Sequence, residues 1–475
     1  MKQRVLFTAG LMISLCIVWT SFNRVFCFKY DDGLRQMTSF YELGDNTVDV
    51  LVLGSSHAFV NILPEEMWSK KKIAAYNLCG SIAPLWNSYY DLIEASKYQK
   101  PKLVILEAFC LTEDIDYSYY SSMIKNVYGM KNSKVKRENI KASIPKEAWI
   151  DYGIEPLQYH GRYKDLSSED YANYYNNPQK YKYWLGNCFF DNIVSFENPN
   201  VINDGVKKKI PEKQCNYYRK IIEYCKQNNQ ELLVIVTPYP GYNMADASIF
   251  NSAKEIAEDE GIRFVNFNEY TEQIGTNWET DYVDRAHMSY IGSSRFTGYL
   301  SDYICENFSI ESHNKDEQVY DRWNKASQYF DRQSFNSSFK RIIDINTYAD
   351  KMSYLDDTYT IVVKFDKPFY WIDEYPELEQ LLYDKWCIQS IDNELEEPKV
   401  WIVDEFGAKS YQKSKYGYNW ARRYGKKELV VSNSGIYYER ENVENGTDGL
   451  SIVIFDSITE SIVDSVMITQ LDIVR

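Results

Sequence analysis

Residues 48–61 read VDVLVLGSSHAFVN, an apolar run that ends at a glycine and is followed by two serines and a histidine. A continuous apolar run of this length indicates a strand that is buried on both faces, as strands of parallel sheets are. The polar residues after it form either an ordinary turn or part of a binding site. For Gly-Ser-Ser taken by itself the turn is the more common structure, so the rest of the chain has to decide.

Four similar apolar runs follow within the first 270 residues, and helical patterns lie between them. The runs are IAAYNL (73–78), KLVILEAF (102–109), ELLVIVTPY (231–239) and RFVNFN (263–268). The helical patterns are SYYDLIEASKYQ (88–99), EKQCNYYRKIIEYCKQNN (212–229) and SIFNSAKEIAEDEG (248–261). Strands that alternate with helices predict an α/β domain with a doubly wound, parallel, five-stranded sheet. In such a sheet ligands bind at the carboxyl ends of the strands, where the Gly-Ser-Ser-His segment lies.

The third and fourth runs are separated by Tyr-rich, weakly periodic sequence from about residue 112 to 215. This stretch is too long for a simple crossover between neighbouring strands. We predict that it is an inserted, mostly helical cap beside the edge of the sheet that carries the serines.

Composition excludes some classes of function. The chain has 475 residues, too many for one ordinary core, and a formal net charge of −15 without a long basic stretch, so nucleic acid is not an expected partner. Its 42 tyrosines suit surfaces that grip sugars, but they are equally well explained by compositional bias. The nine cysteines form no C-x-x-C pair, so we expect neither a disulfide framework nor a metal site, and no cofactor.

The N-terminus predicts a membrane anchor. Lys2 and Arg4 precede an uncharged apolar stretch from Val5 to about Phe22, which is long enough to cross most of a bilayer core. No A-x-A-like cleavage site follows it, so we expect residues 1–30 to remain as an anchor. Basic residues also follow the stretch, so the charges on its two sides do not by themselves fix its orientation. A large domain that follows a short basic N-terminus and one apolar span is nevertheless expected outside the cytoplasm, at the cell surface or in the periplasm.

A serine nucleophile needs a base, and the chain has only four histidines: His57, His160, His287 and His313. His287 lies three residues after Asp284, in DYVDRAHMSYIG (281–292), just before a helical pattern. A carboxylate near an imidazole orients the ring and leaves its other nitrogen to accept a serine proton. The order Ser, Asp, His is also found in other α/β hydrolases. The alternative is that Asp281 and Asp284 are solvent-facing caps and His287 a surface residue.

Gly-x-Ser after the first strand and Asp-x-x-His before the last helix together resemble the SGNH/GDSL hydrolase superfamily. The Gly-Ser-Ser-His variant, with a Gly and a Phe-Thr pair after the second motif, is similar to its bacterial cell-surface branch, which includes alginate O-acetylation proteins and the D-alanyl transfer protein of teichoic-acid operons. The resemblance covers about residues 45–308. It implies a flavodoxin-like sheet of the SGNH type, with Ser56 as nucleophile and Asp284 and His287 as its partners. Ser55 would stand where the family usually has Asp, and His57 would not be the base.

The sequence departs from this family at two places that concern the oxyanion. The second block of the family offers a glycine N–H; here Gly80 is close by, but Ile82 stands at the aligned position, so the donor is any backbone N–H from Gly80 to Ile82. Ser56 and Gly80 are the candidate donors. The third block of the family usually ends its strand with an Asn, whereas the corresponding segment of this chain, LVILEAFC, contains Glu107 and no Asn. Loss of one oxyanion donor typically raises the barrier by about 3 kcal/mol, which favours a slow enzyme or an activated acyl donor.

Beyond residue 310 the pattern changes from α/β to helix and then strand. Residues 31–310 form the expected SGNH-like domain, 311–344 a helical linker and 345–475 a β-rich domain whose strands are predicted to have alternating faces. Strands are expected at YTIVVKF, KVWIVDEF, ELVVSNSGIYY and LSIVIFDSITESIVDSVMIT. We expect binding or spacing from this domain, because it lacks histidine. Its four tryptophans form either a sugar platform or parts of the core: Trp371, Trp386, Trp401 and Trp420.

The expected function is therefore transfer or hydrolysis of acyl esters on a cell-surface or extracellular polysaccharide or another cell-wall polymer. The resemblance implies work beside a membrane-bound O-acyltransferase that supplies acyl groups. The alternative is a surface protein that keeps the fold, binds glycans and has no catalytic activity.

Overall fold

The structure, a computed structural model, describes residues 2–27, 33–166, 185–365, 368–388, 399–412, 419–424, 427–432, 434–446 and 449–475. The chain forms two compact units, residues 1–328 and 329–475, and the division falls within helix α17 (Asp321–Ser338).

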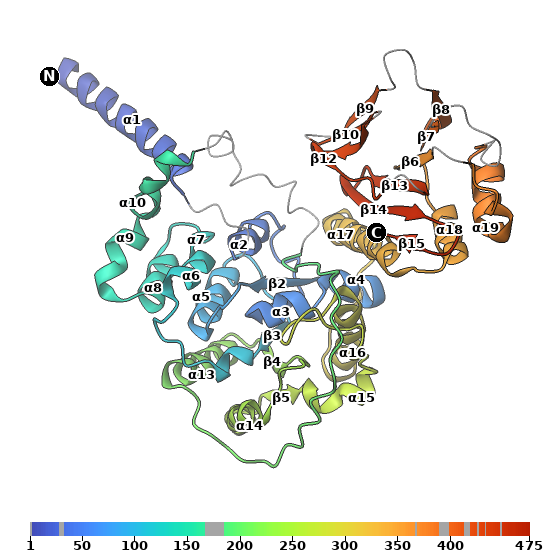
Figure 1. The fold of residues 1–475 in the computed structure, drawn as a ribbon. Coiled ribbons are helices and arrows are strands. Elements are labelled where there is room, and N and C mark those ends of the chain that lie inside the picture. Colours follow the sequence, from blue (N-terminus) through green and yellow to red (C-terminus); the bar gives the residue numbers. More distant parts are fainter. Residues whose placement is uncertain are drawn as a thin grey trace. The chain divides into compact units, whose positions relative to one another are not determined.

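The first unit is built on a five-stranded, all-parallel sheet with the strand order β2-β1-β3-β4-β5 (Figure 1). Its strands are β1 (Val50–Gly54), β2 (Ala75–Cys79), β3 (Leu103–Glu107), β4 (Glu231–Val236) and β5 (Arg263–Asn266). Each overlaps one of the five predicted runs, so the predicted parallel α/β sheet is confirmed. Strand β2 lies on one side of β1, and the next strand in the chain, β3, lies on the other side of β1. The carboxyl end of β1 is therefore the point where the strand order reverses.

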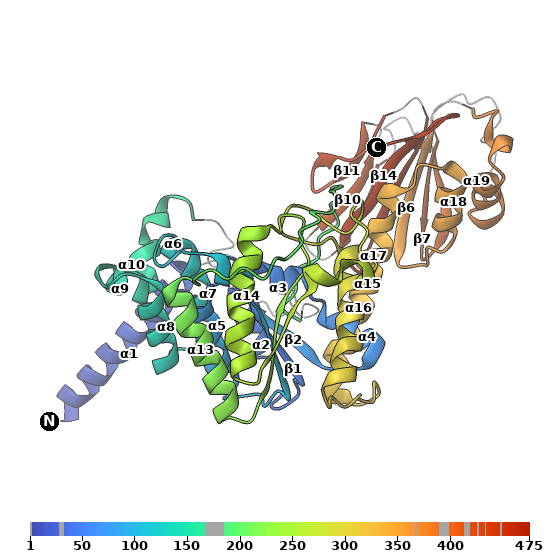
Figure 2. The ribbon, with the colours of Figure 1, turned by 90° about the horizontal axis from the view of Figure 1, so that it is seen from below.

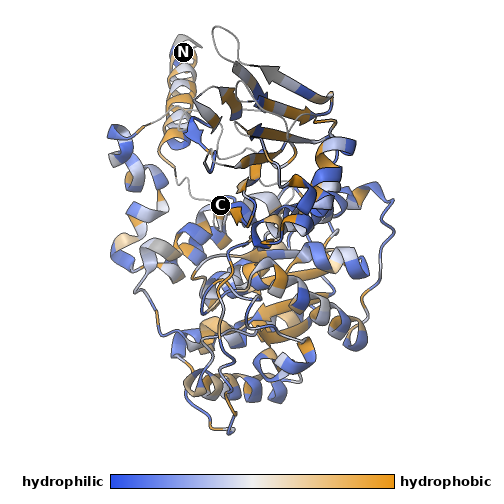
Figure 3. Ribbon diagram, turned by 45° about the vertical axis from the view of Figure 1, so that its right-hand side comes forward, coloured by the Kyte–Doolittle hydropathy of each residue, from blue (hydrophilic) through white to orange (hydrophobic). Residues whose placement is uncertain are grey.

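Helices cover both faces of this sheet (Figure 2). Leu51 and Leu53 share a core with residues of α5 (Leu85–Ala95), α13 (Glu212–Gln227) and α14 (Met244–Asp259). Val50 and Val52 share the other core with residues of α3 (Ser56–Asn61), α4 (Pro64–Lys71) and α16 (Tyr290–Asn307). Strand β1 is thus buried along its whole length, which explains its continuous apolar sequence. Figure 3 shows the strands of this sheet in the colour of hydrophobic residues.

Within the described residues of the predicted cap between β3 and β4, helices are found only in the first half. It contains η1 (Phe109–Thr112), α6 (Tyr120–Met123), α7 (Lys125–Tyr128), α8 (Lys134–Ser143), η2 (Lys146–Ala148), α9 (Trp149–Gly153), α10 (Glu155–Tyr159) and η3 (His160–Lys164). Residues 167–184 lie outside the described part of the chain, and residues 187–211 run without helix or strand until α13 begins. The second half is instead held by contacts with the domain, such as those of Val194 N with Tyr282 O and Phe196 N with Trp278 O.

Helix α1 (Lys2–Val25) contains the apolar stretch at the N-terminus. Residues Arg4–Val25 have a mean hydropathy of 2.0, and none of this window is buried within the protein. The helix is therefore long and apolar enough to span a membrane or to serve as a signal anchor. The other helical elements within the described residues of the first unit are α2 (Leu34–Phe40), η5 (Phe267–Tyr270), α15 (Thr271–Ile274) and η6 (Gln318–Tyr320).

The second unit contains two antiparallel sheets, with the orders β15-β14-β13-β6-β7-β8 and β12-β11-β10-β9. The strands are β6 (Tyr359–Phe365), β7 (Lys399–Asp404), β8 (Gly407–Gln412), β9 (Asn419–Tyr424), β10 (Lys427–Ser432), β11 (Gly435–Tyr438), β12 (Glu441–Asn442), β13 (Leu450–Asp456), β14 (Ser461–Ile468) and β15 (Ile473–Val474). The helical elements are η7 (Phe339–Arg341), α18 (Ile345–Ser353), η8 (Ile372–Glu374), α19 (Pro376–Gln380) and η9 (Leu381–Lys385).

The prediction of alternating faces was wrong for the two central strands of the larger sheet. Strands β6 and β13 are buried at every position. Their two faces contribute to different cores: Ile361 packs with residues of α18 and α19, whereas Val362 packs with residues of the smaller sheet. Both faces are covered, and so both are apolar. The tryptophans follow the same division. Trp386 is buried in the core that contains Ile361, and Trp371 and Trp401 are partly buried against it. Trp420 is partly buried against the core that contains Val362. Of the two roles that the sequence left open, the structure thus shows the core role for Trp386.

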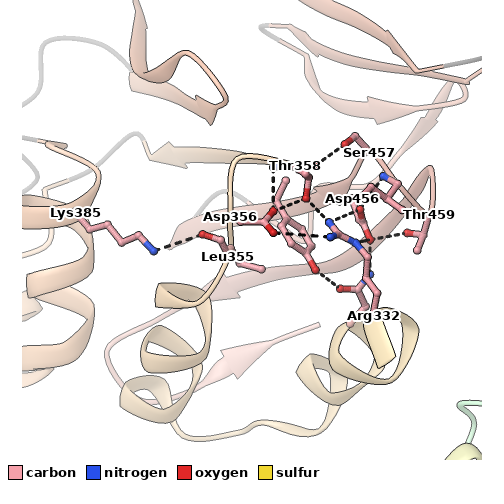
Figure 4. A network of polar contacts seen from close by, with 11 residues as sticks. Arg332, Leu355, Asp356, Thr358, Lys385, Asp456, Ser457 and Thr459 are labelled. Carbon is pink, nitrogen blue, oxygen red and sulfur yellow. Dashed lines mark hydrogen bonds and ion pairs between the residues drawn. The ribbon is translucent and has the colours of Figure 1, made fainter. Parts of the chain in front are cut away.

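A buried ion pair joins α17 to the end of β13 in the second unit (Figure 4). Two nitrogens of Arg332 donate to the two carboxylate oxygens of Asp456, each at 2.7 Å, and the Asp456 side chain is fully buried. Asn336 Nδ2 also donates to Asp456, at 2.7 Å, and the guanidinium lies 4.3 Å from the ring centre of Tyr359. Both charges are therefore hydrogen-bonded on several sides.

Candidate active site

Ser56 lies at the carboxyl end of β1, where it begins α3. The turn between strand and helix requires a glycine. Gly54 has a φ of +148°, and a Cβ at this position would lie 3.0 Å from the Cβ atoms of both Ala58 and Glu107. The tight turn after β1 therefore brings the start of α3 directly over the end of the sheet.

The structure brings together the three residues that the sequence analysis proposed as a triad. His287 Nε2 lies 2.8 Å from Ser56 Oγ, and His287 Nδ1 lies 2.9 Å from Asp284 Oδ2. These are hydrogen-bond distances on both sides of the imidazole. The ring therefore connects the serine to the carboxylate, and with the proton on Nδ1 it can accept the serine proton at Nε2.

The loop before α16 sets the position of His287. Asp284 Oδ1 accepts hydrogen bonds from the backbone N–H groups of Ala286 at 2.7 Å and His287 at 2.8 Å. One carboxylate thus shapes the loop and contacts the imidazole. Asp281 is 1% exposed and bonded to Arg295 Nε at 2.9 Å, so of the two carboxylates only Asp284 faces solvent in part.

Asn61 ties this loop to the helix that carries the serine, and sequence reasoning missed it. Its side chain is fully buried; Oδ1 accepts from Met288 N at 2.8 Å, and Nδ2 donates to Thr237 Oγ1 at 2.9 Å. Met288 directly follows His287, and Asn61 ends the helix that begins at Ser56. The only signal in the sequence was a polar residue at the end of an apolar helix.

Asp284 and Glu107, two of the carboxyl groups near the site, have shifted pKa values. Burial alone would raise the pKa of Asp284, but the hydrogen bonds from the His287 ring and from the backbone of Ala286 and His287 lower it below its ordinary value. Asp284 is therefore ionised at neutral pH. Glu107, fully buried at the end of β3, has its pKa raised by burial to about 8, although the Phe109 N–H donates to it. It is mainly protonated at pH 7 and carries little charge.

The backbone near Ser56 offers donors for an oxyanion, but not all those that the sequence suggested. No hydrogen bond from the backbone N–H of Ser56 or of Ile82 is found within the described residues. The N–H of Gly80 points to Gly54 O at 3.5 Å, and Gly80 is not among the residues that line the cavity beside the serine. Ile82 does line it and has a φ of +53°, a left-handed conformation that is rare for a β-branched residue.

A cavity of about 270 Å³ adjoins Ser56 and His287. Its lining also comprises Ser55, His57, Ile82, Ala83, Phe109, Cys110, Glu113, Ile115, Tyr119 and Ala286. Most of these side chains are apolar, and they come from the loop after β2 and from the segment after β3. The site can therefore hold a small, largely apolar group next to the serine.

The other two histidines, His313 and His160, lie away from Ser56. His313 Nε2 is 2.5 Å from Asp49 Oδ2, at the opposite end of β1 from Ser56. His160 is exposed in the helical cap, and its Nδ1 lies 2.6 Å from Leu157 O. Neither imidazole serves the serine.

No protein-family model and no curated protein sequence matches this chain. Within the part of the chain that the structure describes, no cluster of three metal-binding side chains is found. The chemistry of the site is therefore inferred from its own residues.

Proposed function

We propose that this protein is a serine-dependent O-acyl esterase or O-acyltransferase. The observation that carries the proposal is the pair of hydrogen bonds on His287, one at 2.8 Å to Ser56 Oγ and one at 2.9 Å to Asp284. A serine hydroxyl is a poor nucleophile unless a base removes its proton in the transition state. The fully formed chain of contacts, on the carboxyl edge of a parallel sheet, supports this chemistry better than a polar turn does.

The reaction proceeds in two balanced steps. Ser56 Oγ attacks the acyl carbonyl while His287 Nε2 takes its proton; the bond from the acyl carbon to the substrate alcohol breaks, and His287 returns the proton to the leaving oxygen. In the second step water or a sugar hydroxyl attacks the acyl-serine while His287 Nε2 takes the proton of the attacking hydroxyl. The bond from the acyl carbon to Ser56 Oγ then breaks, and His287 returns the proton to Ser56 Oγ. The ionised Asp284 stabilises the imidazolium that forms in each step.

The oxyanion of both steps is held by backbone N–H groups, with Ser56 and Ile82 as the donors. Both groups adjoin the cavity and have no backbone acceptor within the described residues. Gly80 is a weaker candidate, because its N–H already points to a carbonyl oxygen. The left-handed backbone of Ile82 is the kind of strain that concentrates at functional sites.

We propose further that the chain belongs to the cell-surface branch of the SGNH hydrolases and acts on an acylated glycan or cell-wall polymer. The Gly-Ser-Ser-His and Asp-x-x-His motifs support the family, and the apolar N-terminal helix supports work at a membrane, with the body outside the cytoplasm. A membrane-bound O-acyltransferase that supplies acyl groups is the partner consistent with this position. The reaction as written needs no metal or organic cofactor.

The experiment that tests the function compares two neighbouring serines. Ser56→Ala should lower hydrolysis of acyl esters by about 10⁴-fold or more, because it removes the covalent route. Ser55→Ala is the matched control, since the Ser55 Oγ makes no hydrogen bond within the described residues, and the activity of this variant should stay within about tenfold. Equal activity of the wild type and Ser56→Ala on several esters and acetylated glycans, with glycan binding retained, would instead favour the non-catalytic binding protein.

A further inference from the structure

His57, like Ser55, is a buried polar residue beside the nucleophile for which the proposed reaction has no use, and it alone of the two carries a titratable ring. Its side chain is only 1% exposed, and neither ring nitrogen has a hydrogen-bond partner within the described part of the chain. Buried polar atoms in proteins are nearly always hydrogen-bonded, so two unused nitrogens on one buried ring need an explanation. The residue lines the cavity next to Ser56, which points to a ligand as the missing partner.

Aromatic contacts hold the His57 ring in place without using its nitrogens. The ring stacks on Phe109 with 3.7 Å between centroids and an angle of 12°. The ring of Tyr239 meets it at 89° with 5.1 Å between centroids. The imidazole is thus positioned before any ligand binds, and within the described residues no protein group makes a hydrogen bond to either nitrogen.

The distance to His287 indicates which part of a substrate His57 meets. The two ring centroids are 5.5 Å apart. His287 Nε2 exchanges a proton with the alcohol oxygen that leaves or attacks, so this oxygen must come within about 3 Å of it. The separation of the two rings leaves room for one oxygen about 3 Å from a nitrogen of each ring.

The charge state of His57 matches a hydroxyl group. Burial, together with the neighbouring His287, lowers the pKa of His57 well below its usual range, with a small opposing effect from Asp284. The ring is therefore neutral, with one donor and one acceptor nitrogen. A hydroxyl, which both donates and accepts, complements such a ring, whereas a carboxylate or phosphate would prefer a cation.

We propose that His57 binds the alcohol part of the substrate, a polyol such as a sugar, and thereby determines how well that alcohol competes with water for the acyl-enzyme. This inference rests on the proposed function. On this proposal the cavity has two sides. The apolar walls around Ile82, Ile115 and Tyr119 accommodate the acyl group, and the side formed by the His57 imidazole holds the hydroxyl.

The test uses the full chain in detergent, with active sites counted by a fluorophosphonate label. p-Nitrophenyl acetate acylates the protein, and the products are acetate or an acetylated acceptor, with glycerol and methyl glucoside as acceptors. His57→Phe keeps an aromatic ring against Phe109 and removes both nitrogens, His57→Gln restores a donor and an acceptor, and His160→Phe controls for loss of an exposed imidazole. If His57→Phe gives no labelled sites, His57→Met is measured in its place.

In His57→Phe the burst of p-nitrophenolate per active site should change by less than about threefold, because that leaving group needs no proton. The ratio of transfer to hydrolysis should fall about tenfold, as loss of one hydrogen bond predicts. His57→Gln should recover part of the ratio, and His160→Phe should match the wild type. An unchanged ratio in His57→Phe, or equal losses of burst and transfer, would overturn the inference while leaving the esterase intact. A wild type without label or burst would overturn the proposed function itself.

Discussion

At the scale of single residues, Asn61 as well as Asp284 holds the segment that carries His287. Asn61 holds the backbone next to His287 by one hydrogen bond and Thr237 by another, and it is fully buried. Asn61→Ala leaves the N–H of Met288 without this acceptor, so the loop that carries the imidazole loses its link to α3.

Asn61→Ala should therefore reduce kcat/KM for an acyl ester about 10- to 100-fold, since small displacements of a catalytic group are costly, and destabilise the protein by about 1–3 kcal/mol. Rates of labelling by a fluorophosphonate and urea unfolding measure the two effects. Thr237→Val is the control, because it breaks only the second hydrogen bond. A full rate in Asn61→Ala would show that the loop holds His287 without this link.

Glu107 predicts a dependence of stability on pH. Its folded pKa of about 8 lies above its ordinary value of 4.5, so as pH rises between these values the unfolded chain releases a proton that the folded protein retains. The contribution of Glu107 to the free energy of unfolding is therefore fully present below about pH 4.5 and is lost as the pH rises toward 8. The loss is about 1.4 kcal/mol for each unit by which the pKa is raised.

Glu107→Gln removes this titration and keeps an acceptor for the Phe109 N–H. The urea midpoint of the variant should rise relative to that of the wild type between pH 5 and pH 8. Glu65, whose pKa burial also raises to about 8, remains in both proteins and leaves a residual slope. A constant difference between the two midpoints at all pH values would contradict a protonated Glu107.

At the scale of elements, the buried pair of Arg332 and Asp456 should hold α17 against β13. Removal of one partner of a buried pair leaves an unpaired charge, which costs about 3–5 kcal/mol. Arg332→Met should therefore accelerate hydrogen exchange of β13 amides, as opening of the second unit becomes easier. Arg423→Met is the matched control, because the Arg423 side chain is 73% exposed and lies 4.0 Å from Glu428. Equal exchange in both variants would mean that other contacts hold this helix end.

The elements that the sequence predicted correctly are those with a local signature. Strands β1 to β5 contribute apolar residues to the cores on both faces of the sheet, so most of them are nearly continuous apolar runs that can be recognised without knowledge of their neighbours. The same signature was misread in β6 and β13, because the second face of an antiparallel strand is apolar only when another sheet covers it. Contacts between distant residues left no local signal: Asn61 and Met288 are 227 positions apart. The candidate triad was predictable because both of its motifs are short and contiguous.

At the scale of the whole molecule, the proposed topology concerns everything beyond α1. If the helix is an uncleaved anchor and the body lies outside the cytoplasm, protease added to intact cells should degrade the chain beyond about residue 30. Opened cells and a cytoplasmic marker protein provide the controls. Protection of the body in intact cells would contradict this topology, and a main product that lacks residues 1–25 would identify α1 as a cleaved signal.

The central claim is that Ser56 forms a covalent bond during the reaction, and mass analysis of the trapped protein tests it most directly. The full chain is treated with a fluorophosphonate, digested and mapped, beside His287→Ala, which lacks the base. The account predicts one adduct in the wild type, on Ser56, and almost none in His287→Ala. An adduct on Ser55 or another residue, equal labelling of His287→Ala, or no adduct at all would contradict it.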